Sequence, residues 1–292
     1  MIERCKEIFE SYNIETKDVK ELPGNKYAIT LNDDKKVIVK NIDDKEKIAW
    51  EYKTLFNLQN KMRIPKVFKV GDEYIKEATV LEEIEGMSVR TYEEKEAAAS
   101  LLGNAIGMLH IVEINEQSSE EELKKIWEKH ILSKTLYFGT KIIELFNKDV
   151  NEKIFNYLNE NMHYVKEDYE ATMILGKITN DDYVLSNSRV ILTNFENAMI
   201  GDPTYDFALF YDYYYDNAEQ IDKFISGYED YMGVPENFEN KLPFYKLIVL
   251  LDKIVELSND RDKNKEEIEK ALDMINSIID GKFIVRTYKE EA

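Results

Sequence analysis

The sequence predicts an α+β protein of two lobes, in which a small antiparallel β-rich lobe precedes a larger and mainly helical lobe. Short runs of strand-forming residues fill the chain before Gly86, and apolar residues recur at helical spacing after it. Two β-rich runs, at residues 172–176 and 189–193, interrupt the helical part. We therefore place one lobe at residues 1–84 and the other at residues 85–292, and we expect a ligand site in the cleft between them.

In the small lobe, alternating residues in KYAITL and KVIVK predict two strands joined by a polar turn. A helix follows, because Ile48, Leu55 and Leu58 recur on one side of it, and Pro65 prevents its continuation. The predicted elements are a helix at 3–11, strands at 26–31 and 36–40, a helix at 44–60, and short strands at 66–70, 73–76 and 79–83.

The large lobe is predicted to consist of helices around one β-containing segment. The two β-rich runs are joined by a polar loop, and we expect them to form a hairpin-like site. The predicted helices lie at 92–111, 120–146, 150–165, 204–215, 218–232, 238–259 and 265–279.

Composition limits the possible partners. The 292 residues include 39 Lys and Arg against 58 Asp and Glu, a net charge of −19. Such a surface repels nucleic-acid phosphates, so we expect no nucleic-acid partner. It suits a cationic small molecule or a basic partner, although solubility alone also explains it. The sequence does not indicate an oligomeric state.

The location expected from the sequence is cytoplasmic. Cys5 is the only cysteine, so no internal disulfide is possible. The first residues are charged and amphipathic, unlike a signal peptide, and no apolar run reaches membrane-spanning length. We therefore expect no membrane association.

Residues around the expected cleft suggest a nucleotide site. Lys40 ends the predicted strand KVIVK, where its ammonium group could pair with phosphates, and Glu51 on the next helix could orient it. Taken singly, each is better explained as an exposed surface residue. The segment LPGNKYAIT has only Gly24, so it is either a loose phosphate loop or a plain strand connection. The segment LEEIEG, which includes Glu83, is either a hinge whose backbone contacts a base or a linker.

These motifs, in this order, resemble the aminoglycoside phosphotransferase and choline kinase-like family, relatives of protein kinases. The resemblance covers nearly the whole chain. It rests on VIVK, on EYKTLFNLQNKMRIPKVF with its helix glutamate, on LEEIEG, on LGNAIGMLH and, most specifically, on GDPTYD at 201–206. It implies a bilobal protein-kinase-like fold, with Lys40, Glu51 and Glu83 near a bound ATP.

The catalytic positions depart from this family. Its loop reads HGDxxxxN, and its next strand ends in IDFE or IDWE. By this alignment its catalytic Asp falls on Lys177, its metal-binding Asn on Asp182 and its metal-binding Asp on Asn194, while Gly176 is kept. A protonated lysine cannot accept a proton, so base catalysis is lost at position 177, which costs on the order of 10²–10⁴ in rate.

The metal positions exchange an amide for a carboxylate. Asp182 could hold one Mg²⁺ with help from the amide oxygen of Asn194, but an amide is a weak substitute for a bridging carboxylate. Asp181 and Glu196 are possible replacement carboxylates. We expect ATP binding to be possible and Mg²⁺ binding to be weak or absent.

The best-preserved motif indicates a structural role. The resemblance implies that Asp206 braces the catalytic loop, and Asp202 could cap a helix that begins at Pro203. The aromatic run at 207–215 could line a pocket for a cationic or hydroxylated small molecule, but a role in the helical core is more common for such runs.

Three functions are compatible with the sequence. The first, which we favour, is a catalytically impaired, pseudokinase-type binding or regulatory protein. The second is an active ATP-dependent phosphotransferase acting on a hydroxyl of an aminoglycoside-type or choline-type acceptor. The third is a structural scaffold.

Overall fold

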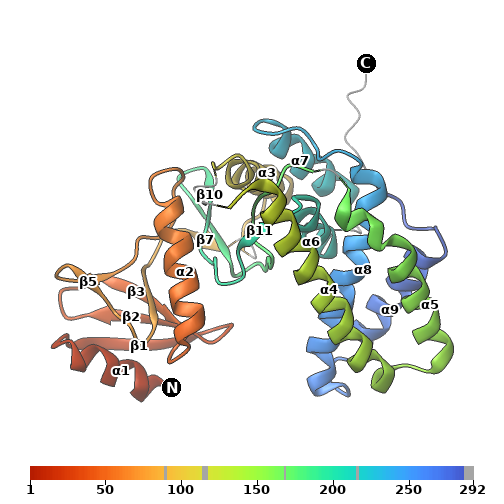
Figure 1. The fold of residues 1–292 in the computed structure, drawn as a ribbon. Helices are drawn as coiled ribbons and strands as arrows, with labels where there is room; N and C mark the ends of the chain where they lie inside the picture. Colours follow the sequence, from red (N-terminus) through yellow and green to blue (C-terminus); the bar gives the residue numbers. More distant parts are fainter. Residues whose placement is uncertain (89–90, 114–117, 168, 215–216, 286–292) are drawn as a thin grey trace.

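The computed structural model describes residues 1–88, 91–113, 118–167, 169–214 and 217–285, with the side chains of 212–214 not described. Two lobes lie side by side, with the small β-rich lobe at the N-terminal end of the chain (Figure 1). The predicted α+β architecture of two lobes is confirmed. The exact lobe boundaries at 84 and 85 stay a prediction.

A four-stranded antiparallel sheet of order β1-β2-β3-β6 forms the small lobe. Its odd-numbered residues on β2 and β3, such as Tyr27 and Val39, pack with Phe9 of α1 in one apolar core. Because strand side chains alternate, the even-numbered residues face the other side, toward α2 and the large lobe. The small lobe contains α1 (Ile2–Ser11), β1 (Thr16–Leu22), β2 (Lys26–Leu31), β3 (Lys36–Lys40), α2 (Lys45–Leu58), β4 (Lys69–Val70), β5 (Glu73–Tyr74) and β6 (Thr79–Glu82).

The large lobe is a helical layer around short strands, and its core extends into α2 of the small lobe through Ile48, Leu55 and Leu58. Its elements are β7 (Met87–Ser88), α3 (Lys95–His110), α4 (Glu120–Leu145), α5 (Lys148–Asn161), a 3₁₀ helix at Met162–Lys166, β8 (Thr172–Ile174), β9 (Tyr183–Ser186), β10 (Arg189–Leu192), β11 (Met199–Gly201), α6 (Thr204–Tyr214), α7 (Ala218–Glu229), α8 (Phe238–Leu257), a 3₁₀ helix at Ser258–Asp260 and α9 (Lys265–Ile279).

The expected hairpin between residues 172–176 and 189–193 is wrong. β8 pairs with β11, and β10 pairs with β9, so the two predicted runs belong to different sheets. The segment between the two predicted runs also contains β9. Asn187 and Ser188 adopt positive φ and form a tight turn, which lets β9 pair with β10 directly after it. β9 also pairs with β7, so β10, β9 and β7 form a three-stranded sheet, whereas β8 and β11 form a two-stranded one.

Other differences lie mainly at element ends and at weakly patterned strands. β1 was not predicted, because TKDVKEL lacks strict alternation and is exposed along much of its length. The predicted strand at 66–70 is regular only at Lys69–Val70, although Val67 forms an isolated bridge with Leu81. No helix of the described residues is long and apolar enough to cross a membrane.

Candidate functional site

The candidate site lies where β2, β3 and α2 of the small lobe meet the segment from Thr179 to Ala198 of the large lobe. Trp50 on α2 donates its indole N–H to the backbone oxygen of Ala198 at 2.7 Å. One carboxylate oxygen of Glu51 accepts the backbone N–H of Phe195 at 3.1 Å. These hydrogen bonds fix the two lobes relative to each other beside the predicted site residues.

Lys40 and Glu51 form a buried ion pair. Lys40 Nζ lies 2.5 Å from Glu51 Oε1, with side-chain exposures of 3% and 0%. The other carboxylate oxygen of Glu51 accepts an N–H from Asn41 at 3.0 Å, so both oxygens are engaged. Lys40 Nζ also donates to Asn194 Oδ1 at 2.5 Å, which links the pair to the strand end after β10. The sequence-predicted residues Lys40, Glu51 and Asn194 are therefore in direct contact.

Asp182 has every acceptor position of its carboxylate occupied. Its Oδ1 atom accepts from Lys26 Nζ at 2.9 Å and from Asn194 Nδ2 at 3.0 Å. Its Oδ2 atom accepts from the backbone N–H of Thr179 at 2.9 Å and from the Thr179 hydroxyl at 2.7 Å. An ionised carboxylate offers about four lone-pair sites, so these four donors satisfy it. A metal ion could bind here only by displacing some of them.

The amide at Asn194 suits this network better than a carboxylate would. Asn194 accepts from Lys40 through Oδ1 and donates to Asp182 through Nδ2. An aspartate there would place a second negative charge against Asp182 without a donor between them, and two carboxylates so placed repel each other. The amide at position 194 therefore fits between Lys40 and Asp182, because it accepts from one and donates to the other.

The donor set does not fit a divalent cation well. Among the described residues, no group of three or more His, Cys, Asp and Glu side chains is placed to hold a metal ion. Glu196 donates its backbone N–H to Asn194 Oδ1 at 3.5 Å, and its carboxylate accepts from the side-chain amide of Asn197 at 3.3 Å. Asp181 contributes its backbone oxygen to Lys26. No step of a reaction is therefore assigned to a metal here.

Lys177 lies outside the network. Its side chain is 45% exposed, and its ammonium group is 3.2 Å from Glu256 Oε2 on α8. From the sequence we expected the ammonium group of Lys177 to stand inside the cleft, in place of the catalytic base. The structure corrects this expectation, because the Lys177 side chain lies at the surface of the large lobe. Lys177 stays at the surface because Glu256 provides a counter-charge there, and because removing an ammonium group from water costs free energy.

Asp206 braces the loop that carries Gly176. Its two carboxylate oxygens accept the backbone N–H groups of Leu175 at 2.7 Å and Gly176 at 3.1 Å. His110, at the end of α3, lies 3.2 Å from the same carboxylate and 2.9 Å from the hydroxyl of Tyr228. Asp206, His110, Leu175 and Tyr228 are buried and Gly176 is half-buried, so the GDPTYD segment holds the loop in a fixed position.

Asp202 begins helix α6. Its Oδ1 atom accepts the N–H of Thr204 at 2.9 Å, as an N-cap residue does. Its Oδ2 atom accepts from Lys241 at 3.3 Å and Tyr245 at 3.2 Å, and all three side chains are buried. Burial, and then the Asp202 carboxylate, raise the pKa of Tyr245 well above its ordinary value, so the phenol remains a donor.

The aromatic run after this motif is core. The side chains of Phe207, Phe210 and Tyr211 are fully buried, and Phe210 stacks on Phe224 of α7. They therefore do not line an open acceptor pocket. The end of the run, at 212–215, lies outside the described side chains.

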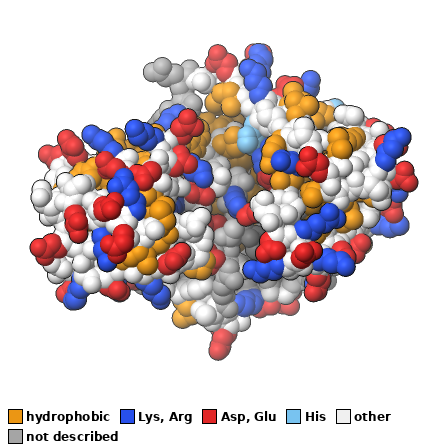
Figure 2. Space-filling view, turned by 90° about the horizontal axis from the view of Figure 1, so that it is seen from below, with side chains coloured by type: hydrophobic (Ala, Val, Ile, Leu, Met, Phe, Trp, Pro, Cys, Tyr) orange, Lys and Arg blue, Asp and Glu red, His pale blue; other side chains and the backbone are white. Residues whose placement is uncertain are grey.

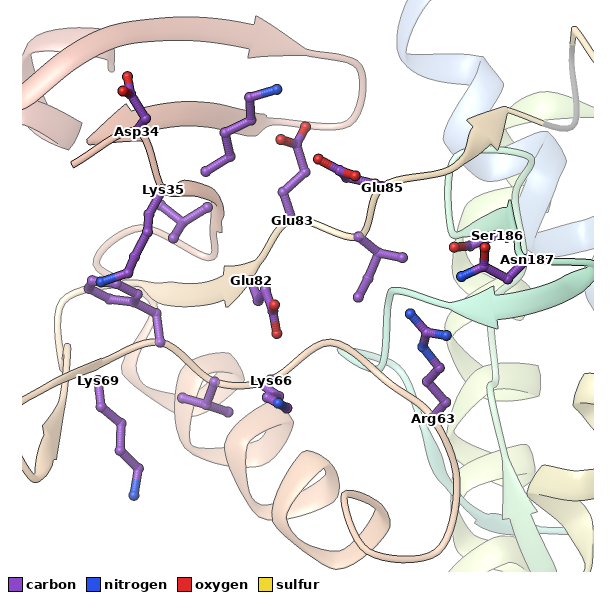
Figure 3. A pocket seen from close by; sticks show the side chains of 15 residues that line it. Asp34, Lys35, Arg63, Lys66, Lys69, Glu82, Glu83, Glu85, Ser186 and Asn187 are labelled. Atoms are coloured by element: carbon purple, nitrogen blue, oxygen red, sulfur yellow. The ribbon is translucent and has the colours of Figure 1, made fainter. Parts of the chain in front are cut away.

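The predicted hinge lies beside a pocket of about 820 Å³, and Glu82, Glu83 and Glu85 are among the residues that line it (Figure 3). Glu83 lines this pocket, and its backbone N–H donates to Lys36 at 3.1 Å, so that N–H is already engaged. Lys66 and Arg63 lie across from the hinge, with Arg63 directed toward Asn187 (Figure 3). The pocket contains none of the residues that form the network around Asp182.

Sequence reasoning missed Lys26. It follows the turn Pro23-Gly24-Asn25, where Gly24 and Asn25 have positive φ and make the connection between β1 and β2 tight. The structure shows a tight connection between β1 and β2, and both interpretations of the segment, a loose phosphate loop and a plain strand connection, stay predictions. The sequence did contain a signal for Lys26. It is the first residue of β2, directly after a turn with one glycine, and the even-numbered residues of this strand face the large lobe.

Comparison with solved structures shows the same fold in small-molecule kinases. The aminoglycoside phosphotransferase APH(2'')-IIIa in complex with GDP and kanamycin has a TM-score of 0.67 at 15% identity, over 97% of this chain and 100% of that one. ADP-bound APH(2'')-Ib gives 0.64 at 18% identity, over 95% and 98%. The choline kinase LicA from Streptococcus pneumoniae gives 0.61 at 17% identity, over 94% and 98%. No protein-family model and no curated protein sequence matches the chain. The fold is therefore that of the aminoglycoside phosphotransferases and choline kinases, as the motif order predicted.

Proposed function

We propose that this protein is a pseudokinase-type binding protein, which holds a phosphate-bearing small molecule in a kinase-like cleft and does not transfer a phosphoryl group. The observation that carries the proposal is the full occupation of the Asp182 carboxylate by Lys26, Asn194 and Thr179. A carboxylate with four donors neither takes up a proton from a hydroxyl nor binds a metal without losing those contacts.

The absence of a base at position 177 supports the same conclusion. Phosphoryl transfer depends on orienting the acceptor hydroxyl and on neutralising charge around the phosphates. Lys177 is paired with Glu256 at the surface, so it does neither. Loss of a general base alone lowers a rate by on the order of 10²–10⁴, and loss of the metal adds to this.

Binding, in contrast, has a ready site. The buried ion pair of Lys40 and Glu51 fixes an ammonium group in the cleft, where it can pair with phosphate oxygens. Structural neighbours with this fold are complexes with ADP and with GDP and kanamycin, which makes a nucleotide the ligand class to test first. Because the N–H of Glu83 is engaged, contact with a base would fall to Ile84 and Glu85.

The test is an assay of ADP release from ATP in the presence of Mg²⁺, with kanamycin or choline as acceptor. We expect no turnover above that of buffer. Lys40→Met is the control for a contaminating ATPase, since contaminating activity would persist in it. Steady turnover that disappears in both Lys40→Met and Asp182→Ala would overturn the proposal. Calorimetric titration with ADP tests separately whether the protein binds a nucleotide.

A further inference from the structure

Lys26 reaches from the small lobe into the cleft and contacts the large lobe. Its ammonium group lies 2.9 Å from Asp182 Oδ1 and 3.1 Å from the backbone oxygen of Asp181. The side chain is only 14% exposed, and its partner Asp182 is 5% exposed. A lysine desolvated to this extent, in contact with a buried carboxylate of the other lobe, has a role beyond solubility.

Lys26 and Lys40 form a pair of ammonium groups on one face of the sheet. In the register of β2 and β3, Tyr27 lies opposite Val39, which places Lys26 opposite Lys40 on the next position along the ladder. Lys26 contacts Asp182 and Lys40 contacts Asn194, and these two residues are hydrogen-bonded to each other. Two cations from adjacent strands therefore converge on one point of the cleft.

Each of these ammonium groups has donor capacity left. An ammonium carries three N–H groups, and the structure gives two acceptors to Lys26 and two to Lys40. The remaining N–H on each can bond to an oxygen of a ligand. Two such donors fixed by ion pairs, in a protein of net charge −19, make a localised site for an anion with several oxygens.

Local charge argues against a divalent ion at this point. The positive charges of Lys26 and Lys40 balance the negative charges of Asp182 and Glu51, and Asn194 is neutral. Within this network no net negative charge is left to attract Mg²⁺. A polyphosphate bound here would lie beside the ammonium group of Lys26 and would be held by its remaining N–H group.

We propose that the Lys26–Lys40 pair binds the phosphates of a nucleoside diphosphate without a divalent metal, with Lys26 supplying the positive charge that Mg²⁺ would supply. This inference rests on the proposed binding function. It adds a separate claim, that the affinity for the nucleoside diphosphate does not depend on a metal ion and does depend on Lys26, which follows the β1–β2 turn.

The experiment is calorimetric titration of ADP into the full chain, once in EDTA and once in excess Mg²⁺. We expect binding in EDTA and no more than a threefold gain in affinity with Mg²⁺. Lys26→Met should weaken binding in EDTA by at least tenfold, and Lys26→Arg, which keeps the charge, should stay within about threefold of the unmodified protein. Lys17→Met, on the same hairpin but in an exposed ion pair, should bind ADP unchanged.

The outcomes separate the two proposals. Binding of ADP that appears only with Mg²⁺, or binding in EDTA that is unchanged in folded Lys26→Met, would overturn the inference and leave the binding function standing. A lack of ADP binding in both buffers would overturn the nucleotide-binding function and the inference together. Circular dichroism of each variant establishes that it is folded, and the comparison of EDTA with Mg²⁺ in the unmodified protein keeps the test decisive where Lys26→Met is poorly folded.

Discussion

Replacing Lys26 by Met is expected to destabilise the protein, because it leaves the carboxylate of Asp182 buried without its counter-charge. Lys17 is the matched control. It lies on the neighbouring strand β1, and its ammonium is 2.7 Å from Asp34, against 2.9 Å in the Lys26–Asp182 pair. The two pairs differ in burial: side-chain exposures are 60% and 76% in the control, against 14% and 5%.

The expected magnitude follows from this difference in burial. Removal of one partner from a fully buried ion pair costs about 3–5 kcal/mol, and exposed pairs contribute about 0–1 kcal/mol. Asp182 keeps three other donors, from Asn194 and Thr179, which reduces the penalty. We therefore expect Lys26→Met to lower the free energy of unfolding by about 2–3 kcal/mol. Lys17→Met should lower it by less than about 1 kcal/mol.

The assay is urea denaturation followed by circular dichroism, with a thermal melt as a second measurement. A loss of 2–3 kcal/mol corresponds to a Tm lower by about 4–6 °C in a chain of this size. A double-mutant cycle of Lys26→Met with Asp182→Asn should give a coupling of about 1–2 kcal/mol. Equal costs for Lys26→Met and Lys17→Met would refute the reasoning, because burial would then not distinguish the pairs.

Two further predictions concern the loop and the pH dependence. Gly176→Ala should cost about 2–4 kcal/mol in urea denaturation, because φ is +68° and an added Cβ would lie 2.4 Å from the carbonyl oxygen of Asn197. Gly71→Ala, with φ +63° and open space, should cost only about 1 kcal/mol, and equal costs would contradict the steric argument. Burial, and then Lys134, lower the pKa of His130 to about 4. The neutral ring is therefore favoured by folding, and this stability is complete above about pH 6.5 and lost as the pH falls toward 4. Between pH 7 and 5 the unmodified protein should lose about 1–2 kcal/mol more than His130→Gln, after allowance for solvent screening, and parallel pH profiles would exclude this role.

The order of elements could be read from the sequence because local patterns determine it. Alternation in KYAITL and KVIVK predicted strands at the bounds that the structure has, Lys26–Leu31 and Lys36–Lys40. The spacing of Ile48, Leu55 and Leu58 predicted the buried side of α2. The motif order from VIVK to GDPTYD predicted the kinase-like fold, and the structural comparisons confirm it. Each of these signals lies within a short segment of chain.

The pairing of the strands around the site could not be read in this way. The runs at β8 and β10 have similar composition, and nothing local states that their partners are β11 and β9. Strand pairing depends on which apolar faces are buried against each other, and this is a property of the assembled lobe. The sequence therefore indicated strands here but assigned them the wrong partners.

By itself, the sequence determined the fold class, and its resemblance to a kinase family predicted that residues at positions 177, 182 and 194 differ from those of that family. Only the tertiary structure decided what those replacements do. Lys26 and Asp182 are 156 residues apart, and Lys177 turns to Glu256 because α8 passes beside it. Contacts between side chains distant in the chain arise when apolar surfaces pack and bring their charged edges together, and no local pattern records that distance.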